Sequence, residues 1–565
     1  MIVDIIPTKK MPKNLSVLSY TVPKDLEASL NLGQIATIPI RNSTTSGVIV
    51  NIYKSKKFPY PLKNIINLAS TKPIFTKNQL ELFQRLADYY HVSASLFIHF
   101  NLPKLIKKDW KKVKQHKKTS AQTLVLVPRI TDIDHAAKKL GIKKFTPIYK
   151  KSSRAENFST YLKASTAPTL IGTRSAIFYP YTNLRKIIIY DEHSSDHKQT
   201  DMNPRYDAAV AAEALSKFTK ARVRYISPSP SVLNYHKLNL KPVKLNHPVT
   251  ISNLENELIK KNFSFISEDL LKAIKKNQKN IFLFVNKKGD STSTSCKDCL
   301  HTFNCPTCSL PFAKNNKNQF ICYYCDHGED IPPFCPKCSG PNFHSTGLGI
   351  QKVETNLKKL FPKLSIQRLD KDSGQSKRIN LKANIIIGTE FALDKIPWKK
   401  IDLIGIINAD SLWHHSEFAA SELAYQKIIK ILTLAKKGAT IIIQSFKTDH
   451  YIIAALALDK PELFYKNELG FRKKFSYPPF TNLIKLSYLH KSDTVAEKNA
   501  CKLYDKIISS KKDISSPMPI LRKKIRGKYK YNIILKLDNL DEFNSISKSI
   551  PNDWLIDIHP RTLLD

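Results

Sequence analysis

Glycine is scarce in this chain, with only 15 glycines among 565 residues. None lies between Gly47 and Gly141, and the only Gly-Lys pair, Gly527-Lys528, is followed by a tyrosine. The phosphate-binding loop of a nucleotide hydrolase needs a glycine-rich turn followed by lysine and then serine or threonine. The sequence therefore excludes a phosphate loop of this type, which argues against ATP as a cofactor.

Long apolar runs are also missing. No run reaches 18 apolar residues, so no membrane-spanning helix is predicted and no membrane partner is expected. The first residues are apolar and the charges follow them, which is the reverse of a secretory signal. We therefore expect a cytoplasmic protein. Its length and its 42% of apolar residues predict several globular domains.

Acidic residues are few, with 47 against 91 lysines and arginines, and the net charge is +44. Such an excess favours a polyanionic partner such as nucleic acid. A lysine-rich and glycine-poor bias of the source proteome would produce the same excess. Charge alone therefore does not identify a DNA-binding protein.

Cysteine is concentrated in one region. Eight of the nine cysteines lie between residues 296 and 338, in four CxxC pairs. Two such turns supply the four thiolates of one tetrahedral zinc ion, so four pairs predict two zinc ions per chain in closed, structural sites. Redox dithiols and an iron–sulfur cluster are the competing interpretations. Spacing leaves both sequential and nested pairing open. Cys501 stands apart and is expected to be a buried core thiol.

The chain divides by pattern into six segments. Residues 1–103 read as a small domain with strands near 34–39 and 47–53 and a helix near 78–90. Residues 104–120 form a lysine-rich linker, and continuous apolar runs in 121–286 and 346–450 are typical of parallel strands buried on both faces. A zinc module at 287–345 is expected between these two α/β lobes, and 451–565 forms a C-terminal α+β domain.

The linker carries eight lysines within residues 104–118. It is either a solvated connection or an arm that contacts phosphate. The lysines that we consider candidates for DNA contact are Lys104, Lys107, Lys108, Lys111 and Lys112.

Several motifs occur along the chain in a fixed order: LVLVP (124–128), IGTRSAIFYP (171–180), YDEH (190–193), the four CxxC pairs, GLGIQKVE (347–354), IIGTE (386–390), NADSL (408–412), YPPF (477–480) and WLIDIHPRTLL (554–564). In this order they closely resemble the PriA family of primosomal replication restart proteins, which are superfamily-2 DNA helicases. The block TVPKDLEASLNLGQIATIPI is similar to that family's 3′-end-binding domain. The resemblance spans nearly the whole chain.

The resemblance implies a specific fold and function. It implies two helicase-like lobes with an inserted double zinc module and small N- and C-terminal domains. It also implies DNA contact in residues 1–103, including Tyr20 and Gly33, in the zinc module and in the C-terminal domain. It implies nested zinc pairing, with Cys296, Cys299, Cys335 and Cys338 on one ion and Cys305, Cys308, Cys322 and Cys325 on the other. The implied partners are forked and single-stranded DNA, the replicative helicase or its loader, and single-stranded-DNA-binding protein.

The chain departs from the family where ATP is hydrolysed. The phosphate loop and the winged-helix domain are absent, so we expect the first lobe to be rearranged or shortened. The family's arginine-bearing QxxGRxGR segment aligns with residues 427–435, which places Ile431 and Leu434 at the arginine positions. Asp191 and Glu192 remain, but without those parts they are better interpreted as leftover hydrogen-bonding carboxylates than as catalysts.

The N-terminal domain departs as well, because Leu18-Ser19 replaces the family's aromatic–acidic pair before Tyr20. This weakens the case for specific recognition of a 3′ hydroxyl but not for DNA binding in general. We therefore expect a restart scaffold without helicase activity. An ATP-dependent 3′-to-5′ helicase with an unusual nucleotide site is the alternative. A zinc protein repurposed to bind RNA or another protein ranks third.

Overall fold

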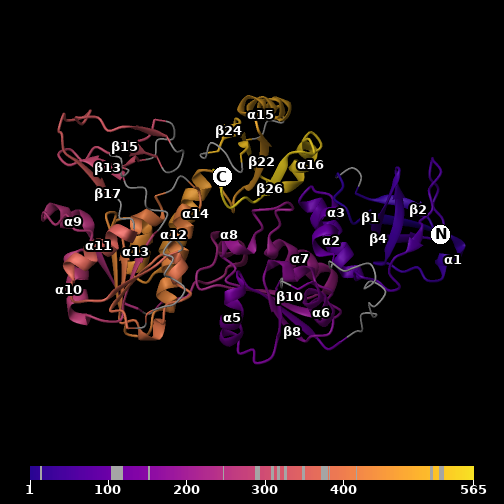
Figure 1. The fold of residues 1–565 in the computed structure, drawn as a ribbon, viewed down its shortest axis with the longest axis horizontal. Helices are drawn as coiled ribbons and strands as arrows, with labels where there is room; N and C mark the ends of the chain where they lie inside the picture. The colour runs from indigo at the N-terminus through magenta and orange to yellow at the C-terminus, as the bar shows by residue number, and fades with distance from the viewer. Residues whose placement is uncertain are drawn as a thin grey trace. The chain divides into compact units, whose positions relative to one another are not determined.

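The computed structural model describes the chain except for residues 13–15, 103–118, 150–152, 246, 287–292, 307–310, 315–318, 323–326, 347–349, 371–379, 381, 415–416, 510–512, 521–526 and 565. The chain forms two compact units (Figure 1). Unit 1 holds residues 1–227 and 541–559, and unit 2 holds residues 228–540 and 560–565. Among the helices described, none is long and apolar enough to cross a membrane.

The N-terminal domain of unit 1 is an antiparallel sheet with the strand order β2-β1-β4-β3-β5. Its strands are β1 (Ile2–Pro7), β2 (Leu18–Thr21), β3 (Ile35–Ile40), β4 (Ser43–Tyr53) and β5 (Asn67–Leu68), and a short helix α1 (Lys24–Glu27) follows β2. Alternate residues such as Val3 and Ile5 enter a shared core. The strands expected near 34–39 and 47–53 are confirmed as β3 and part of β4.

Two helices join this domain to the first lobe. They are α2 (Lys77–Tyr89), which begins at a capping box formed by Thr76 and Gln79, and α3 (Ala94–Asn101). The buried Gln79 amide donates to the Phe178 carbonyl at 2.7 Å, and the Asp207 amide donates to the Tyr90 hydroxyl at 2.8 Å. The expected helix near 78–90 is therefore confirmed, and it packs against the lobe.

The first lobe is a parallel five-stranded sheet with the order β10-β9-β6-β8-β7. Its elements are β6 (Gln122–Leu126), α5 (Ile133–Lys139), β7 (Thr146–Ile148), α6 (Arg154–Ala164), β8 (Thr169–Gly172), β9 (Leu184–Tyr190), α7 (Ala208–Thr219) and β10 (Arg222–Ile226). Among the described residues, no strand pairs with the outer side of β10. Its exposed Arg222 and Arg224 are typical of an edge strand.

The second lobe is a parallel six-stranded sheet with the order β11-β21-β20-β12-β19-β18. Its strands are β11 (Val249–Asn253), β12 (Ile281–Val285), β18 (Ile366–Leu369), β19 (Ile385–Gly388), β20 (Leu403–Ile407) and β21 (Thr440–Ser445). The mixed α/β architecture with two parallel sheets is thus confirmed. The lobe boundary expected at residue 286 is wrong, because β12 pairs with β19 and β20.

Helices cover both faces of this second sheet (Figure 1). On one side lie α8 (Val232–Leu238), α12 (Ala420–Leu434), α13 (Tyr451–Ala457) and α14 (Pro461–Lys474); on the other lie α10 (Glu268–Asn277) and α11 (Ile350–Leu360). Helix α9 (Leu254–Ile259) follows β11. Helices α13 and α14 belong to the core of this lobe. We expected the C-terminal domain to begin at residue 451. That boundary is wrong, because α13 and α14 still belong to the second lobe.

The cysteine-rich module is inserted into the second lobe, between β12 and α11, and not between the two lobes. Its strands are β13 (Ser293–Cys296), β14 (Ala313–Lys314), β15 (Gln319–Ile321), β16 (Gly328–Asp330) and β17 (Phe343–Thr346). β13 pairs with β17, so the two ends of the insertion lie side by side.

The C-terminal part of the chain contributes to both units. In unit 2, β22 (Asn482–His490) and β25 (Tyr529–Leu537) pair antiparallel, β23 (Asp513–Ile514) and β24 (Met518–Pro519) add to β25, and α15 (Asp493–Ile508) packs on β22 and β25. In unit 1 lie α16 (Phe543–Ser547) and β26 (Leu555–Ile558). There the buried Asp557 forms ion pairs with Lys198 at 2.7 Å and Arg205 at 3.1 Å.

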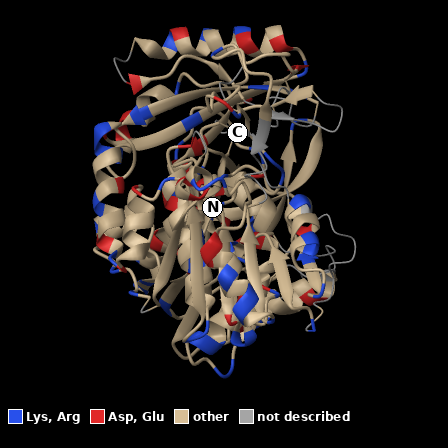
Figure 2. Cartoon of the chain, turned by 90° about the vertical axis from the view of Figure 1, so that its left-hand side faces the viewer, with Lys and Arg blue, Asp and Glu red and all other residues tan. Residues whose placement is uncertain are grey.

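Charge is distributed over most of the surface helices (Figure 2). Lysine and arginine appear on many of the helices in view, interspersed with fewer acidic residues. A single basic stripe of the kind that marks one nucleic-acid groove is not seen in this view. In this view the charge excess therefore does not single out one element as a binding surface.

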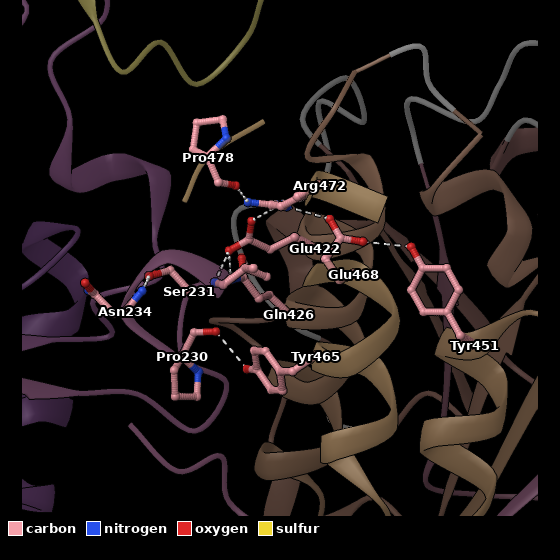
Figure 3. A network of polar contacts seen from close by, with 11 residues as sticks. Pro230, Ser231, Asn234, Glu422, Gln426, Tyr451, Tyr465, Glu468, Arg472 and Pro478 are labelled. Carbon is pink, nitrogen blue, oxygen red and sulfur yellow. Dashed lines mark hydrogen bonds and ion pairs between the residues drawn. The ribbon is translucent and has the colours of Figure 1, made fainter. Parts of the chain in front are cut away.

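One charged network is buried inside unit 2, and Figure 3 shows its members converging from several elements. Arg472 on α14 donates to Glu422 on α12 at 2.5 Å and to Glu468 at 2.9 Å. Its third contact is with the Pro478 carbonyl at 3.0 Å, and the Tyr451 hydroxyl donates to Glu468 at 2.7 Å. The guanidinium thus neutralises two carboxylates that would otherwise be costly to bury.

The same network holds the first residues of unit 2. The Glu422 carboxylate accepts hydrogen bonds from the Val232 amide at 2.9 Å and from Gln426 at 3.0 Å. Nearby, the Tyr465 hydroxyl donates to the Pro230 carbonyl at 2.7 Å. The segment that enters unit 2 at Pro228 is therefore fixed to α12 and α14 by buried polar contacts (Figure 3).

Replacing Arg472 by methionine should destabilise unit 2 by about 3–5 kcal/mol, because two buried carboxylates would be left without their shared cation. The deficit should shrink as the pH falls. Burial raises the pKa of Glu468 above its ordinary value, and a protonated Glu468 needs no counter-ion. Urea unfolding of the full chain at several pH values measures this.

Lys427→Met is the matched control for this variant. Lys427 pairs with Glu390 at 2.9 Å, but the side chain of Glu390 is 59% exposed, so removing the pair should cost at most about 1 kcal/mol. An Arg472→Met variant no less stable than Lys427→Met would contradict the role assigned to the network.

Candidate metal and DNA-contact sites

The clearest site is formed by the outer two CxxC pairs. The sulfur atoms of Cys296, Cys299, Cys335 and Cys338 all lie within 4.8 Å of one another. The Cys296–Cys338 sulfur distance is 3.5 Å and the Cys299–Cys335 distance is 3.7 Å. A tetrahedral ion with zinc–sulfur bonds of about 2.3 Å would place its sulfurs about 3.8 Å apart. Four cysteines in this arrangement could hold a metal ion, and they are the set that nested pairing requires.

Backbone turns create this arrangement. The Cys296 amide donates to the His301 carbonyl, and the Cys335 amide donates to the Gly340 carbonyl. A Cβ atom at Gly340 in the second turn would lie 2.0 Å from the Asp298 carboxylate, so a larger residue there would require the Asp298 side chain to move. The pairing of β13 with β17 then brings the two turns together.

The inner cysteine pairs are described only in part. Cys305 and Cys322 are buried in a small core with Phe303, Phe312 and Phe320. Their predicted partners, Cys308 and Cys325, lie outside the described residues. Cys501 is exposed on α15, so the expectation of a buried core thiol was wrong.

The remnant carboxylates lie at the carboxyl end of β9. Asp191 adopts a left-handed backbone conformation with φ of 50°, and Glu192 is buried. The Glu192 amide donates to the Ile226 carbonyl at 3.2 Å, and His193 contacts the Ser227 hydroxyl at 2.7 Å. This group links the ends of two neighbouring strands.

The positions aligned with the family's arginines lie on α12. Ile431 is completely buried in the core of the second lobe, and Leu434 is half-buried. Both residues are apolar and neither can supply a cation. The arginine that contacts α12 is Arg472, which pairs with Glu422 and is itself buried.

The predicted DNA-contact residues of the N-terminal domain have structural roles. Tyr20 is 5% exposed, and its hydroxyl donates to the Pro39 carbonyl at 2.9 Å. Gly33 has φ of 83°, and a Cβ atom there would lie 2.0 Å from the Phe75 carbonyl oxygen. The lysines of the linker, Lys104, Lys107, Lys108, Lys111 and Lys112, lie outside the described residues.

Sequence reasoning missed a polar cluster around Asp4 in the same domain. Asp4 pairs with Ser19 on β2 and with Asn51 on β4 in the strand register. Its carboxylate accepts hydrogen bonds from Ser19 at 2.6 Å and from Tyr53 at 2.8 Å. Lys56 lies 3.8 Å from the carboxylate. An aspartate within the apolar strand IVDIIP was the signal that could have revealed this cluster.

The Asp4 cluster also alters the chemistry of its neighbours. The hydrogen bond to Asp4 is the main cause that raises the pKa of Tyr53 above its ordinary value. The carboxylate that is missing at Ser19 is thus present one strand away.

Comparison with known proteins identifies the N-terminal domain first. A family model described as the 3′ DNA-binding domain of PriA matches residues 7–103. The chain is also similar to proteins named replication restart protein PriA. It is 26% identical over 643 residues to that of Rickettsia prowazekii, which covers 96% of this chain and 97% of the relative.

Other relatives carry the same name but are covered less completely. The protein of Borreliella burgdorferi is 29% identical over 443 residues, covering 73% of this chain and 67% of the relative. The protein of Bacillus subtilis is 29% identical over 433 residues, covering 70% of this chain and 53% of the relative. This chain therefore spans about half of the Bacillus protein.

Solved structures give a weaker likeness. The Mycobacterium smegmatis helicase Lhr bound to single-stranded DNA and AMP-PNP has a TM-score of 0.31 and 10% identity, covering 60% of this chain and 42% of that one. Yeast Dbp5 bound to RNA has a TM-score of 0.30 and 10% identity, and the match covers 67% of this chain and 85% of that one. Scores this low carry no argument about function. The informative comparisons are the other two: residues 7–103 match the 3′ DNA-binding domain of PriA, and almost the whole chain is similar to a replication restart protein PriA.

Proposed function

We propose that this chain is a fork-binding scaffold of replication restart that does not hydrolyse ATP. The observation that carries the proposal is a pair of departures from the motifs with which such proteins hydrolyse ATP. The sequence has no glycine between residues 47 and 141 with which to build a phosphate loop, and Ile431 is buried at an expected arginine position. Arginine at that position stabilises charge on the transferring phosphoryl group, which an isoleucine cannot do.

The proposed ligand is forked DNA with an unpaired strand. The match to a 3′ DNA-binding domain supports binding of DNA, and the names of the relatives support a role in replication restart. The proposed protein partners are the replicative helicase or its loader and single-stranded-DNA-binding protein. In this role the two lobes hold the DNA-binding parts together and need no nucleotide cycle.

We also propose that the cysteine module binds two zinc ions. The outer cysteines would hold one ion, and Cys305, Cys308, Cys322 and Cys325 would hold the other. Four thiolates close the coordination shell, so both ions would be structural. The retained Asp191 and Glu192 favour one competing function, an ATP-dependent 3′-to-5′ helicase with an unusual nucleotide site.

Purified protein should contain about two zinc ions per chain by elemental mass spectrometry. Cys335→Ser should remove about one of them, because Cys335 belongs to the outer set. Cys305→Ser should remove the other and lower the melting temperature, since zinc binding here is coupled to folding. Cys501→Ser, at an exposed cysteine outside the module, is the control and should keep both ions. Iron with visible absorbance, or a single ion in the intact chain, would rule out this assignment.

The second test concerns ATP hydrolysis with and without forked DNA. No stimulated hydrolysis is expected, and Asp191→Asn should leave restart in cells unaffected. If forked DNA stimulates hydrolysis and Asp191→Asn abolishes it, the chain is the competing helicase.

The third test compares affinities for a fork, a plain duplex and a structured RNA at physiological salt. The intact chain should prefer the fork, because recognition of shape would come from the folded domains. Replacing the eight lysines of residues 104–118 by glutamine should lower the log–log salt slope on duplex DNA by about 0.9 for each phosphate that these lysines neutralise, and should spare the preference for forks. An unchanged slope would identify the segment as a linker. Equal affinity for fork and duplex would contradict the scaffold proposal.

A further inference from the structure

A group of aromatic side chains surrounds Lys56 beside the Asp4 cluster. The Lys56 ammonium lies 4.4 Å from the ring centre of Tyr53 and 5.2 Å from that of Phe58. The rings of Phe58 and Tyr60 are 5.9 Å apart, and Tyr60 is 60% exposed. One cation and three rings therefore lie together on the surface of the N-terminal domain.

Asp4 contacts two members of this group directly, Tyr53 and Lys56. It is 6% exposed, and its carboxylate is satisfied by Ser19, Tyr53 and Asn51. Tyr53 ends β4, while Lys56 and Phe58 lie in the irregular segment that follows, so the fold of that segment does not by itself fix their side chains. Asp4 constrains Tyr53 through a hydrogen bond and Lys56 through an ion pair at 3.8 Å. Phe58 contacts Lys56 and not Asp4.

The alternation of side chains along β1 explains why Asp4 lies on the face of the sheet that is turned away from the core. Val3 and Ile5 point into the core of the domain, so Asp4 between them points to the other face. Burying a carboxylate costs free energy that a neutral residue would not incur. Hydrogen bonds from Ser19, Asn51 and Tyr53 offset this cost. The ring of Tyr53 also contacts the Lys56 ammonium.

Aromatic rings beside a cation match the chemistry of an unpaired nucleic-acid strand. Bases stack on aromatic rings regardless of sequence, and a lysine neutralises the adjacent phosphate. A paired base presents no free face to such a ring. A surface of this kind therefore discriminates an unpaired strand from a duplex.

We propose that Tyr53, Lys56, Phe58 and Tyr60 form a stacking platform for unpaired nucleotides of DNA, and that Asp4 is its positioning residue. The proposal rests on the DNA binding proposed above and names the surface that carries it. Phe58 and Tyr60 stack on bases, Lys56 meets a phosphate, and Tyr53 supports Lys56 through its ring and its hydroxyl bond to Asp4. Tyr20 and Gly33 then serve the fold of the domain and not the contact.

The test measures binding of the full chain to two forks that differ in one respect. In the first fork the unpaired arm carries normal bases, and in the second every nucleotide of that arm is abasic. Stacking of a single base is worth a factor of about 5 to 150 in affinity, so the wild type should bind the abasic fork at least about 5-fold more weakly. Tyr60→Ala and Phe58→Ala should weaken binding to the normal fork by a similar factor and should largely abolish the difference between forks.

Matched controls come from the same chain. Phe263 is 72% exposed in unit 2, and Phe263→Ala should behave as the wild type. Lys56→Ala should lower the log–log salt slope by about 0.7 on a single-stranded arm, whereas exposed Lys54→Ala should not change it. Asp4→Asn should reduce the discrimination against the abasic fork with an unchanged melting temperature, which a purely structural role would not produce.

The outcomes separate this inference from the proposed function. If the wild type does not bind forks in preference to duplex, the proposed function fails. If the wild type prefers forks but binds the normal and abasic forks equally, and Tyr60→Ala behaves as Phe263→Ala, the stacking platform alone is overturned. Because Tyr60 is largely exposed, its replacement tests the platform even if Phe58→Ala fails to fold.

Discussion

The organisation of unit 2 depends on the burial of one guanidinium. Arg472 is 2% exposed, and it joins the carboxylates of α12 and α14 to the turn at Pro478. Buried ion pairs contribute little net stability, since desolvation offsets most of the attraction, but removing one partner is costly. The network therefore acts mainly by specifying one geometry. Through Glu422 this geometry extends to Val232, where the chain has just entered the unit.

The position of the cysteine module follows from a second constraint. β13 and β17 bracket an insertion that begins after β12 and ends before α11, both of which belong to the second lobe. The four outer cysteines lie at or near the ends of these strands, where they close the neck of the insertion. An ion held there would link the segment after β13 to the segment before β17. Of the inner cysteines, Cys305 and Cys322 are buried with Phe303, Phe312 and Phe320 in the small core of the module.

Local pattern predicted the strands well but did not predict which strands are neighbours. The apolar run at 281–286 contains β12, yet β12 belongs to the second lobe and not to the first. An apolar run indicates burial on both faces and carries no information about pairing. The ion pair of Lys198 with Asp557 joins residues far apart in sequence, so no local signal could assign β26 to unit 1. Tyr20 and Gly33 were selected by resemblance, and their burial depended on side-chain packing that a motif does not encode.

Charges that the family carries are missing from this chain in two places, and the structure treats the two absences differently. At Ser19 the missing carboxylate has a substitute, because Asp4 lies directly opposite on the paired strand and accepts the Ser19 hydroxyl. On α12 the expected arginine positions have become apolar, and Ile431 packs inward among the core residues of the lobe. At Ser19 the surface remains polar, because Asp4 supplies a carboxylate. On α12 the side chain of Ile431 contributes only to the core of the lobe. The polar surface around Asp4 therefore keeps a carboxylate, whereas α12 offers no cation at Ile431 or Leu434.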